Sequence, residues 1–179
     1  MMEISKAIIQ YLLSTVRHKA FVFWAGWKIV GGITFWRLLI HDWTKFMPVE
    51  FVNYAKNYKL PGGRKKYPDA FIKAWMHHQK NNKHHPEYWT TVGIFEWAHG
   101  AVPMPEAYVR EWVADLLGAS REYTGGWDMS IWLKKNIDRW NYCHPNTLAY
   151  FTGVLTDLGY PIENYRDIGM GLIFNDNQG

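Results

Sequence analysis

Histidines and aspartates recur along this chain in an order that can assemble a metal site. The clearest sign is the adjacent pair His41-Asp42, which His18 precedes. The run His77–His85 carries four histidines, and Asp115 lies farther along. Imidazole nitrogens and carboxylate oxygens are the ligands of Zn, Mn and Fe sites. Because these residues fall on successive expected helices, the sequence predicts a site for one or two divalent ions, with Mn, Fe, Mg, Zn or Co as candidates.

Length, charge and cysteine content limit the kinds of protein in which such a site could lie. The chain has 179 residues and a formal net charge of +4, which is too small a charge to indicate nucleic-acid binding. A chain of this length can bury a core without disulfides. Cys143 is its only cysteine, which excludes a disulfide framework and a cysteine-rich zinc finger. We therefore expect one cytoplasmic domain over residues 1–170 and a flexible tail over residues 171–179.

Helices are the elements that must position these residues, since apolar residues recur at helical spacing and no period-2 strand is found. The predicted fold class is all-α. In the first helix His18 falls on the same stripe as Tyr11 and points inward. We expect a break flanked by Gly26 and Gly31-Gly32, and then a helix carrying Phe35 to Asp42. A helix from Pro48 and a loop over Lys59 to Tyr67 should follow. The remaining expected helices run from Pro68, from Pro86 to about Ala98, from Pro105 to just before Gly118, around Ser130–Asn141 and around Asn146–Leu158.

Residues 20–40 are apolar enough to be considered as a membrane span. Lys28 and Arg37 interrupt them, and Gly31-Gly32 breaks them, so that no stretch of about 20 uninterrupted apolar residues remains. The segment therefore predicts buried helices, and no membrane partner is expected.

Several candidate ligands have close competitors in the sequence. On the Pro68 helix, His78 shares the inner face with Trp75, whereas His77 points outward. His84 and His85 lie at a helix junction, where the pattern favours His85 but leaves both open. On a later helix Glu111 and Asp115 share a face, one turn apart. Asp115 is the favoured ligand, and Glu111 is a catalytic candidate and the alternative ligand.

Each of these residues also has a simpler explanation when it is taken alone. His18 could be a hydrogen-bonded core histidine, and His41-Asp42 could cap a helix end. Glu111 and Asp115 could lie on a solvated helix surface. The convergence of several ligand types on at least four expected helices favours the metal site over these separate explanations.

The ordered series resembles the HD-domain superfamily of metal-dependent phosphohydrolases, which are all-helical. The resemblance extends over roughly residues 15–125 and is nearest to an uncharacterised HD-like family of bacteria and phages. It implies a single-domain HD-like helical bundle, but it implies no particular substrate. The matching strings are His41-Asp42-Trp43-Thr44-Lys45-Phe46, Glu50-Phe51, Ala74-Trp75, His78, Asn81, His84-His85-Pro86-Glu87-Tyr88-Trp89, Pro103-Met104-Pro105, Glu111 and Asp115.

The resemblance also implies roles for individual residues. Asp42 would bridge two metals, and Lys45 is similar to a lysine that approaches the substrate phosphate in the two-metal phosphodiesterase branch. The Gly-Tyr-Pro signature of that branch is absent, so cyclic-dinucleotide cleavage is not implied. The implied ligands are His18, His41, Asp42 and Asp115 for the first metal, and Asp42, His78 and His85 for the second.

The expected function is hydrolysis of a nucleotide or other phosphate ester by a metal-dependent phosphohydrolase. Two divalent ions about 3.5–4 Å apart can activate water and hold both the attacking and the leaving oxygen. Lys45 and Glu111 are the catalytic candidates, and Lys45 and Arg64 are the candidates for binding substrate. Arg64, Lys65 and Lys66 are also explained as a solvated basic loop.

Two other functions remain open at this stage. One is an HD-type di-iron oxygenase, because second-metal histidines suit iron as well. The other is a non-catalytic phage or bacterial binding protein built on the same helices. Lys45 favours a phosphate substrate over oxygen chemistry. The expected partner is a small phosphorylated molecule, nucleic acid is not favoured, and a homo-oligomer is left open.

Overall fold

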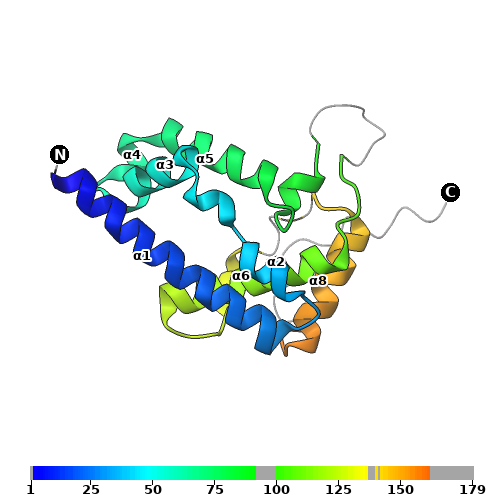
Figure 1. Ribbon diagram of the computed structural model, residues 1–179. Helices are drawn as coiled ribbons and strands as arrows, with labels where there is room; N and C mark the ends of the chain where they lie inside the picture. The colour runs from blue at the N-terminus through cyan, green and yellow to red at the C-terminus, as the bar shows by residue number, and fades with distance from the viewer. Residues whose placement is uncertain (1, 92–99, 137–139, 141, 162–179) are drawn as a thin grey trace.

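The described part of the chain, residues 2–91, 100–136, 140 and 142–161, is built from eight α-helices and contains no strand (Figure 1). This confirms the predicted all-α class. A π-helical turn (Ala25–Val30) and the 3-10 turns Trp43–Phe46 and Pro86–Trp89 lie between these helices. The α-helices are α1 (Met2–Trp24), α2 (Phe35–Ile40), α3 (Pro48–Lys59), α4 (Gly63–Lys66), α5 (Pro68–Asn81), α6 (Glu106–Thr124), α7 (Ser130–Asn136) and α8 (Pro145–Asp157).

Helix starts follow the local chemistry of the sequence. Pro48, Pro68 and Pro145 stand in the first turn of α3, α5 and α8, where proline loses no helical hydrogen bond and its fixed φ suits the helix. Thr34 caps α2, since its hydroxyl accepts a hydrogen bond from the backbone N–H of Arg37 at 3.4 Å. These local signals set where the helices begin, but not how they cross.

Helix α1 is the element that joins the two sides of the molecule, because it packs against both α6 and α3 (Figure 1). Its crossing with α6 is tight at Gly118, where an added Cβ would lie 2.5 Å from Cγ2 of Val22. The sequence placed Gly118 just past a helix end, and this was wrong. Helix α6 continues to Thr124, and its C-terminal glycine is Gly125, with φ +79°.

Two groups of buried side chains flank the polar centre of the molecule. The larger one joins α1, α6 and α8 through residues such as Val22, Leu117 and Phe151. The smaller one joins α1, α3 and α5 and includes Tyr11 and Tyr54. Helices that contribute to these two groups carry part of the polar centre, namely His18, Glu50, His78, Glu111 and Asp115, and apolar packing fixes the positions of these residues. The rest of the centre lies on turns between helices.

Other expected elements also differ from the structure. The predicted loop over residues 59–67 contains the short helix α4. The predicted helix over residues 86–98 is only a 3-10 turn as far as Trp89, and Thr90 then forms an antiparallel bridge with Ala101. Thr90 and Thr91 are β-branched and favour extended backbone, which accounts for the early end of that turn. Residues 92–99 lie outside the described residues.

Three further expectations concern helix ends and the tail. The glycine break lies only at Gly31-Gly32, which have φ values of +67° and +69°, because Gly26 falls inside the π-helical turn. The last predicted helix agrees with α8 to within a residue at each end. The predicted tail over residues 171–179 lies outside the described residues. Among the described helices, none is both long enough and apolar enough to cross a bilayer.

Candidate metal centre

The pair His41-Asp42 lies at a sharp turn of the backbone directly after α2. Helix α2 ends at Ile40, so the expectation that it carries both residues was wrong. Asp42 has φ +54° and ψ +27°, the left-handed conformation, and no other non-glycine residue among those described has a positive φ. Lys19 of α1 donates a hydrogen bond to the backbone carbonyl of His41. This turn directs the fully buried Asp42 carboxylate toward the centre of the molecule.

The first group of possible ligands combines α1, the turn and α6. Nε2 of His18 lies 2.9 Å from Oδ1 of Asp115 and 3.9 Å from Oδ2 of Asp42. Nε2 of His41 lies 3.3 Å from the same Asp42 oxygen and 3.5 Å from Oδ1 of Asp115. One atom from each of the four residues falls within 4.8 Å of the others, so this group could hold a metal ion.

The second group uses the other oxygen of Asp42. Oδ1 of this carboxylate lies 3.4 Å from Nε2 of His78 and 3.3 Å from Nε2 of His84. Nε2 of His85 is 2.8 Å from Nε2 of His78. These four residues also offer one atom each within 4.8 Å of one another. His84, which the sequence pattern set below His85, therefore lies in this group together with it.

Asp42 is the residue that the two groups share, with one oxygen facing each. Oδ1 of Asp42 has no hydrogen-bond partner among the described residues, and the same holds for Nε2 of His41 and of His84. Oδ2 of Asp42 forms an ion pair with the Lys45 ammonium. Buried polar atoms that lack hydrogen bonds are costly. Ligand atoms on one ion with bonds of about 2.1 Å stand roughly 3.0–3.4 Å apart, which agrees with the distances from Asp42 to His41, His78 and His84. The residues therefore fit divalent ions.

Glu111 lies behind the histidines, on the side away from Asp42. One of its oxygens is 2.9 Å from Nδ1 of His41 and 3.3 Å from Nδ1 of His84. Arg37 approaches the other oxygen at 3.6 Å. A carboxylate that accepts from Nδ1 orients an imidazole and leaves Nε2 free for a metal. The geometry thus suits Glu111 to orienting one histidine from each group.

Glu50, a residue that the sequence analysis did not single out as functional, does the same for α5. Its carboxylate lies 2.8 Å from Nδ1 of His78 and 2.6 Å from Nδ1 of His77. Glu50 is fully buried in α3, whereas His77 is partly exposed. Its spacing of one helical turn from the inward-facing Tyr54 was the signal that could have revealed it.

Charges within the centre shift the titration of its groups. Burial opposes protonation of His41, but the charge of Asp42 and the nearby carboxylate of Asp115 raise the pKa of His41 well above its usual value. Burial alone would raise the pKa of Asp42, yet the charges of His41 and Lys45 hold it well below the usual value. Without a metal, His41 therefore carries a proton that a metal must displace.

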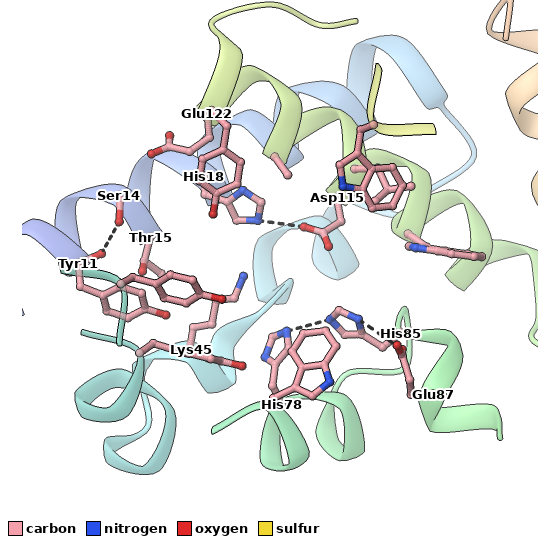
Figure 2. A pocket seen from close by; sticks show the side chains of 18 of the residues that line it. Tyr11, Ser14, Thr15, His18, Lys45, His78, His85, Glu87, Asp115 and Glu122 are labelled. Carbon is pink, nitrogen blue, oxygen red and sulfur yellow. Dashed lines mark hydrogen bonds and ion pairs between the residues drawn. The ribbon is translucent and has the colours of Figure 1, made fainter. Parts of the chain in front are cut away.

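A cavity of about 470 Å³ opens beside the centre, and His18, Lys45, His78, His85 and Asp115 all line it. Figure 2 shows His18 and Asp115 on one side of this cavity and His78 and His85 on the opposite side. The side chain of Lys45 points between them, with Nζ 2.5 Å from Oδ2 of Asp42 (Figure 2). The cavity is of a size that takes small-molecule ligands.

The walls of the cavity combine rings with further charges. Arg64, a predicted substrate-binding residue, lines it from α4, and its guanidinium carbon lies 5.4 Å from the centre of the Tyr58 ring. Lys59 lines it as well, whereas Lys65 and Lys66 do not. Tyr11 and Trp75 contribute aromatic surface. The cavity can thus offer cations to an anionic group and rings to an apolar one.

Comparison with curated proteins and with solved structures finds no match. A family model, described as "Family of unknown function (DUF5662)", matches residues 7–157. This range spans most of the chain and includes all the residues of both possible metal-binding groups. The chain therefore belongs to the DUF5662 family.

Proposed function

We propose that this protein is a metal-dependent phosphohydrolase that cleaves a nucleotide or other phosphate ester. The observation that most supports this proposal is the position of Asp42. Its two oxygens face two separate groups of histidines, and a lysine ammonium lies beside it. A carboxylate shared between two ion sites, next to a cation, is an arrangement suited to phosphate chemistry.

In this proposal each residue group holds one divalent ion. His18, His41 and Asp115 would hold the first, and His78, His84 and His85 the second, with Asp42 contributing to both. Bound divalent ions supply Lewis acidity toward a phosphoryl oxygen and lower the pKa of water. Glu111 and Glu50 keep the imidazoles oriented, because they accept from Nδ1 and leave Nε2 toward Asp42.

Lys45 supplies the positive charge that a phosphate ester needs. Its ammonium faces the cavity, and the charge of Asp42, which outweighs the effect of burial, raises its pKa, so it stays protonated. A preorganised cation stabilises negative charge that grows in the transition state. Arg64 and Lys59, farther along the cavity wall, would contact more distant anionic groups of the substrate.

We propose further that the DUF5662 family is a branch of the HD-domain superfamily. The order of the candidate ligands along the chain and the all-helical structure both support this relationship. The di-iron oxygenase is the second candidate function, because the second group combines three imidazoles with one carboxylate, a nitrogen-rich set that suits iron.

The direct experiment is metal analysis of the purified protein, followed by a panel of nucleotides and p-nitrophenyl phosphate with Mn, Mg, Fe or Co. We expect bound metal and metal-dependent phosphate release, both lost in Asp42→Asn. Asp157→Asn, at the exposed end of α8, is the matched control and should change neither. Wild-type protein that binds no metal would refute the proposal. Oxygen-dependent turnover without phosphate release would favour the oxygenase.

A further inference from the structure

Helix α1 has a second apolar face on the side away from the core. Ile9, Leu13, Val16 and Trp24 follow one another at intervals of three or four residues, or of twice that, which places them on one stripe. Trp27 lies three residues after Trp24, in the π-helical turn that continues the helix. Leu13 is 65% exposed, Val16 53% and Trp24 53%. The opposite face of the helix carries Tyr11 and His18 inward. A surface helix usually has a polar outer face, so this stripe is unusual.

The stripe continues onto α2 through a row of aromatic rings. The Trp27 ring is 6.3 Å from the Phe35 ring, which lies 5.4 Å from the Trp36 ring. Trp36 is 71% exposed, and Ile40, one turn later, is 59% exposed. We call this continuous surface the outer apolar face and define it by Ile9, Leu13, Val16, Trp24, Trp27 and Trp36. Helix α1, which carries most of these residues, runs along one edge of the molecule (Figure 1).

The segment that carries the outer apolar face is also one-sided in charge. Between Glu3 and Asp42 the sequence has no acidic residue, but it has five basic ones: Lys6, Arg17, Lys19, Lys28 and Arg37. Arg17 pairs with Glu122, Arg37 approaches Glu111, and Lys19 donates a hydrogen bond to the backbone carbonyl of His41. Lys6 and Lys28 are exposed and make no ion pair with a described residue. The surface therefore offers apolar side chains flanked by positive charge.

We propose that the outer apolar face binds the surface of an anionic lipid bilayer. Tryptophan and leucine side chains on one side of a helix, with flanking lysines, suit the boundary between headgroups and acyl chains. Basic residues close to such a surface add attraction to anionic headgroups. The proposal differs from the expectation drawn from the sequence, which was that the protein has no membrane partner. It does not depend on the proposed phosphohydrolase function, because none of the six residues belongs to the metal centre.

A second copy of the chain fits this surface less well. In a two-fold symmetric dimer each patch contacts itself, which would bring the basic flanks of two copies together. Like charges in contact oppose association. An anionic bilayer meets both properties of the surface, its apolar stripe and its positive flanks.

Vesicle flotation of the full-length protein tests the proposal. We expect binding to phosphatidylcholine vesicles that contain about 30 mol % phosphatidylglycerol, weak binding to phosphatidylcholine alone, and a loss of binding in high salt. The double variant Leu13→Ser/Trp36→Ser should lower partitioning at least about tenfold, and Lys28→Glu about fivefold. The controls Ile72→Ser/Ile131→Ser and Lys134→Glu change exposed residues of α5 and α7, and these variants should bind like wild type.

Circular dichroism confirms that each variant is folded before partitioning is compared. Absence of vesicle binding by the wild type overturns the proposal, and so does an equal loss in the α5 and α7 controls. Concentration-dependent self-association that Leu13→Ser/Trp36→Ser abolishes, without vesicle binding, assigns the surface to a dimer instead. Metal content and phosphoester turnover of these variants should stay at wild-type values, which separates this proposal from the function proposed above.

Discussion

Asp42 combines three properties that are individually unfavourable. It is fully buried, its backbone is left-handed, and its carboxylate oxygen Oδ1 has no hydrogen bond from a described residue. A left-handed conformation costs a non-glycine residue roughly 1–2 kcal/mol, although Asp tolerates it better than most residues do. The proposed metal pair explains all three properties together, because bridging two ions requires this carboxylate at the point between the two groups.

Substitution of Lys45 tests the proposed phosphate chemistry without removing a metal ligand. Lys45→Met should retain bound metal and lower phosphoester turnover by about a hundredfold or more, since one preorganised charge is lost from the transition state. Metal analysis and steady-state kinetics measure both effects. Lys65→Met, on the exposed α4, should leave turnover unchanged. Full activity in Lys45→Met would exclude its catalytic role.

Substitution of Glu111 tests its role in orienting the histidine ligands. Glu111→Gln removes the charge that Nδ1 of His41 and of His84 faces, so we expect a loss of metal affinity of about 10–100-fold. The pKa of Glu111 is held at about 2: burial opposes ionisation, but hydrogen bonds from His41 and His84 prevail, so the carboxylate is charged at neutral pH. Mn²⁺ titration calorimetry measures the loss. Glu106→Gln, on the exposed first turn of α6, is the control. Partial rescue by Glu111→Asp would separate lost charge from lost packing.

At the scale of elements, the crossing of α1 and α6 brings His18 to Asp115. Gly118→Ala should lower the free energy of unfolding by about 1–3 kcal/mol, because its Cβ would lie 2.9 Å from the backbone N of Val22. Gly153→Ala, at an exposed position of α8, meets no atom within 4 Å and should raise stability by up to about 1 kcal/mol. Urea denaturation compares the two. Equal effects would mean that the crossing is looser than the structure shows.

The same crossing leads us to expect an effect of Gly118 on the metal centre. His18 and Asp115 each lie one helical turn from the closest contact between Val22 and Gly118. Metal affinity in Gly118→Ala should therefore fall together with stability. The unaffected centre in Gly153→Ala is the reference for that comparison.

At the scale of the whole molecule, metal binding, pH and stability are coupled. The raised pKa of His41 stabilises the metal-free fold below the unfolded pKa of about 6.5, and this contribution is lost as the pH rises through the higher folded value. A metal ion binds the neutral imidazole, so metal affinity rises over the same pH range.

We expect Mn²⁺ to raise the melting temperature more at pH 8 than at pH 6, and EDTA to cancel the increase. Calorimetry in two buffers should show proton release on binding. A metal effect that is independent of pH would contradict the ligand role of His41.

The sequence by itself determined the helical class, the starts of α3 and α5 at prolines, and the residue types of a metal site. These features are local, since periodicity and proline geometry act within a few residues. Prediction from the sequence failed where contacts between distant residues determine the structure. Gly118 looked like a helix end because a glycine at a close helix crossing and a glycine at a helix terminus are alike in sequence.

Only the tertiary structure decided which ligands converge and what supports them. Choosing between His84 and His85 required the turn after α5, which brings both toward His78. The roles of Glu50 and Glu111 depend on side chains from other helices that meet their carboxylates. The exposure of the outer apolar face could not be predicted from the sequence either. Hydrophobic spacing indicates that a helix face is apolar, but not whether another helix covers it. Burial is a property of the packed molecule, and residues distant in the chain determine it.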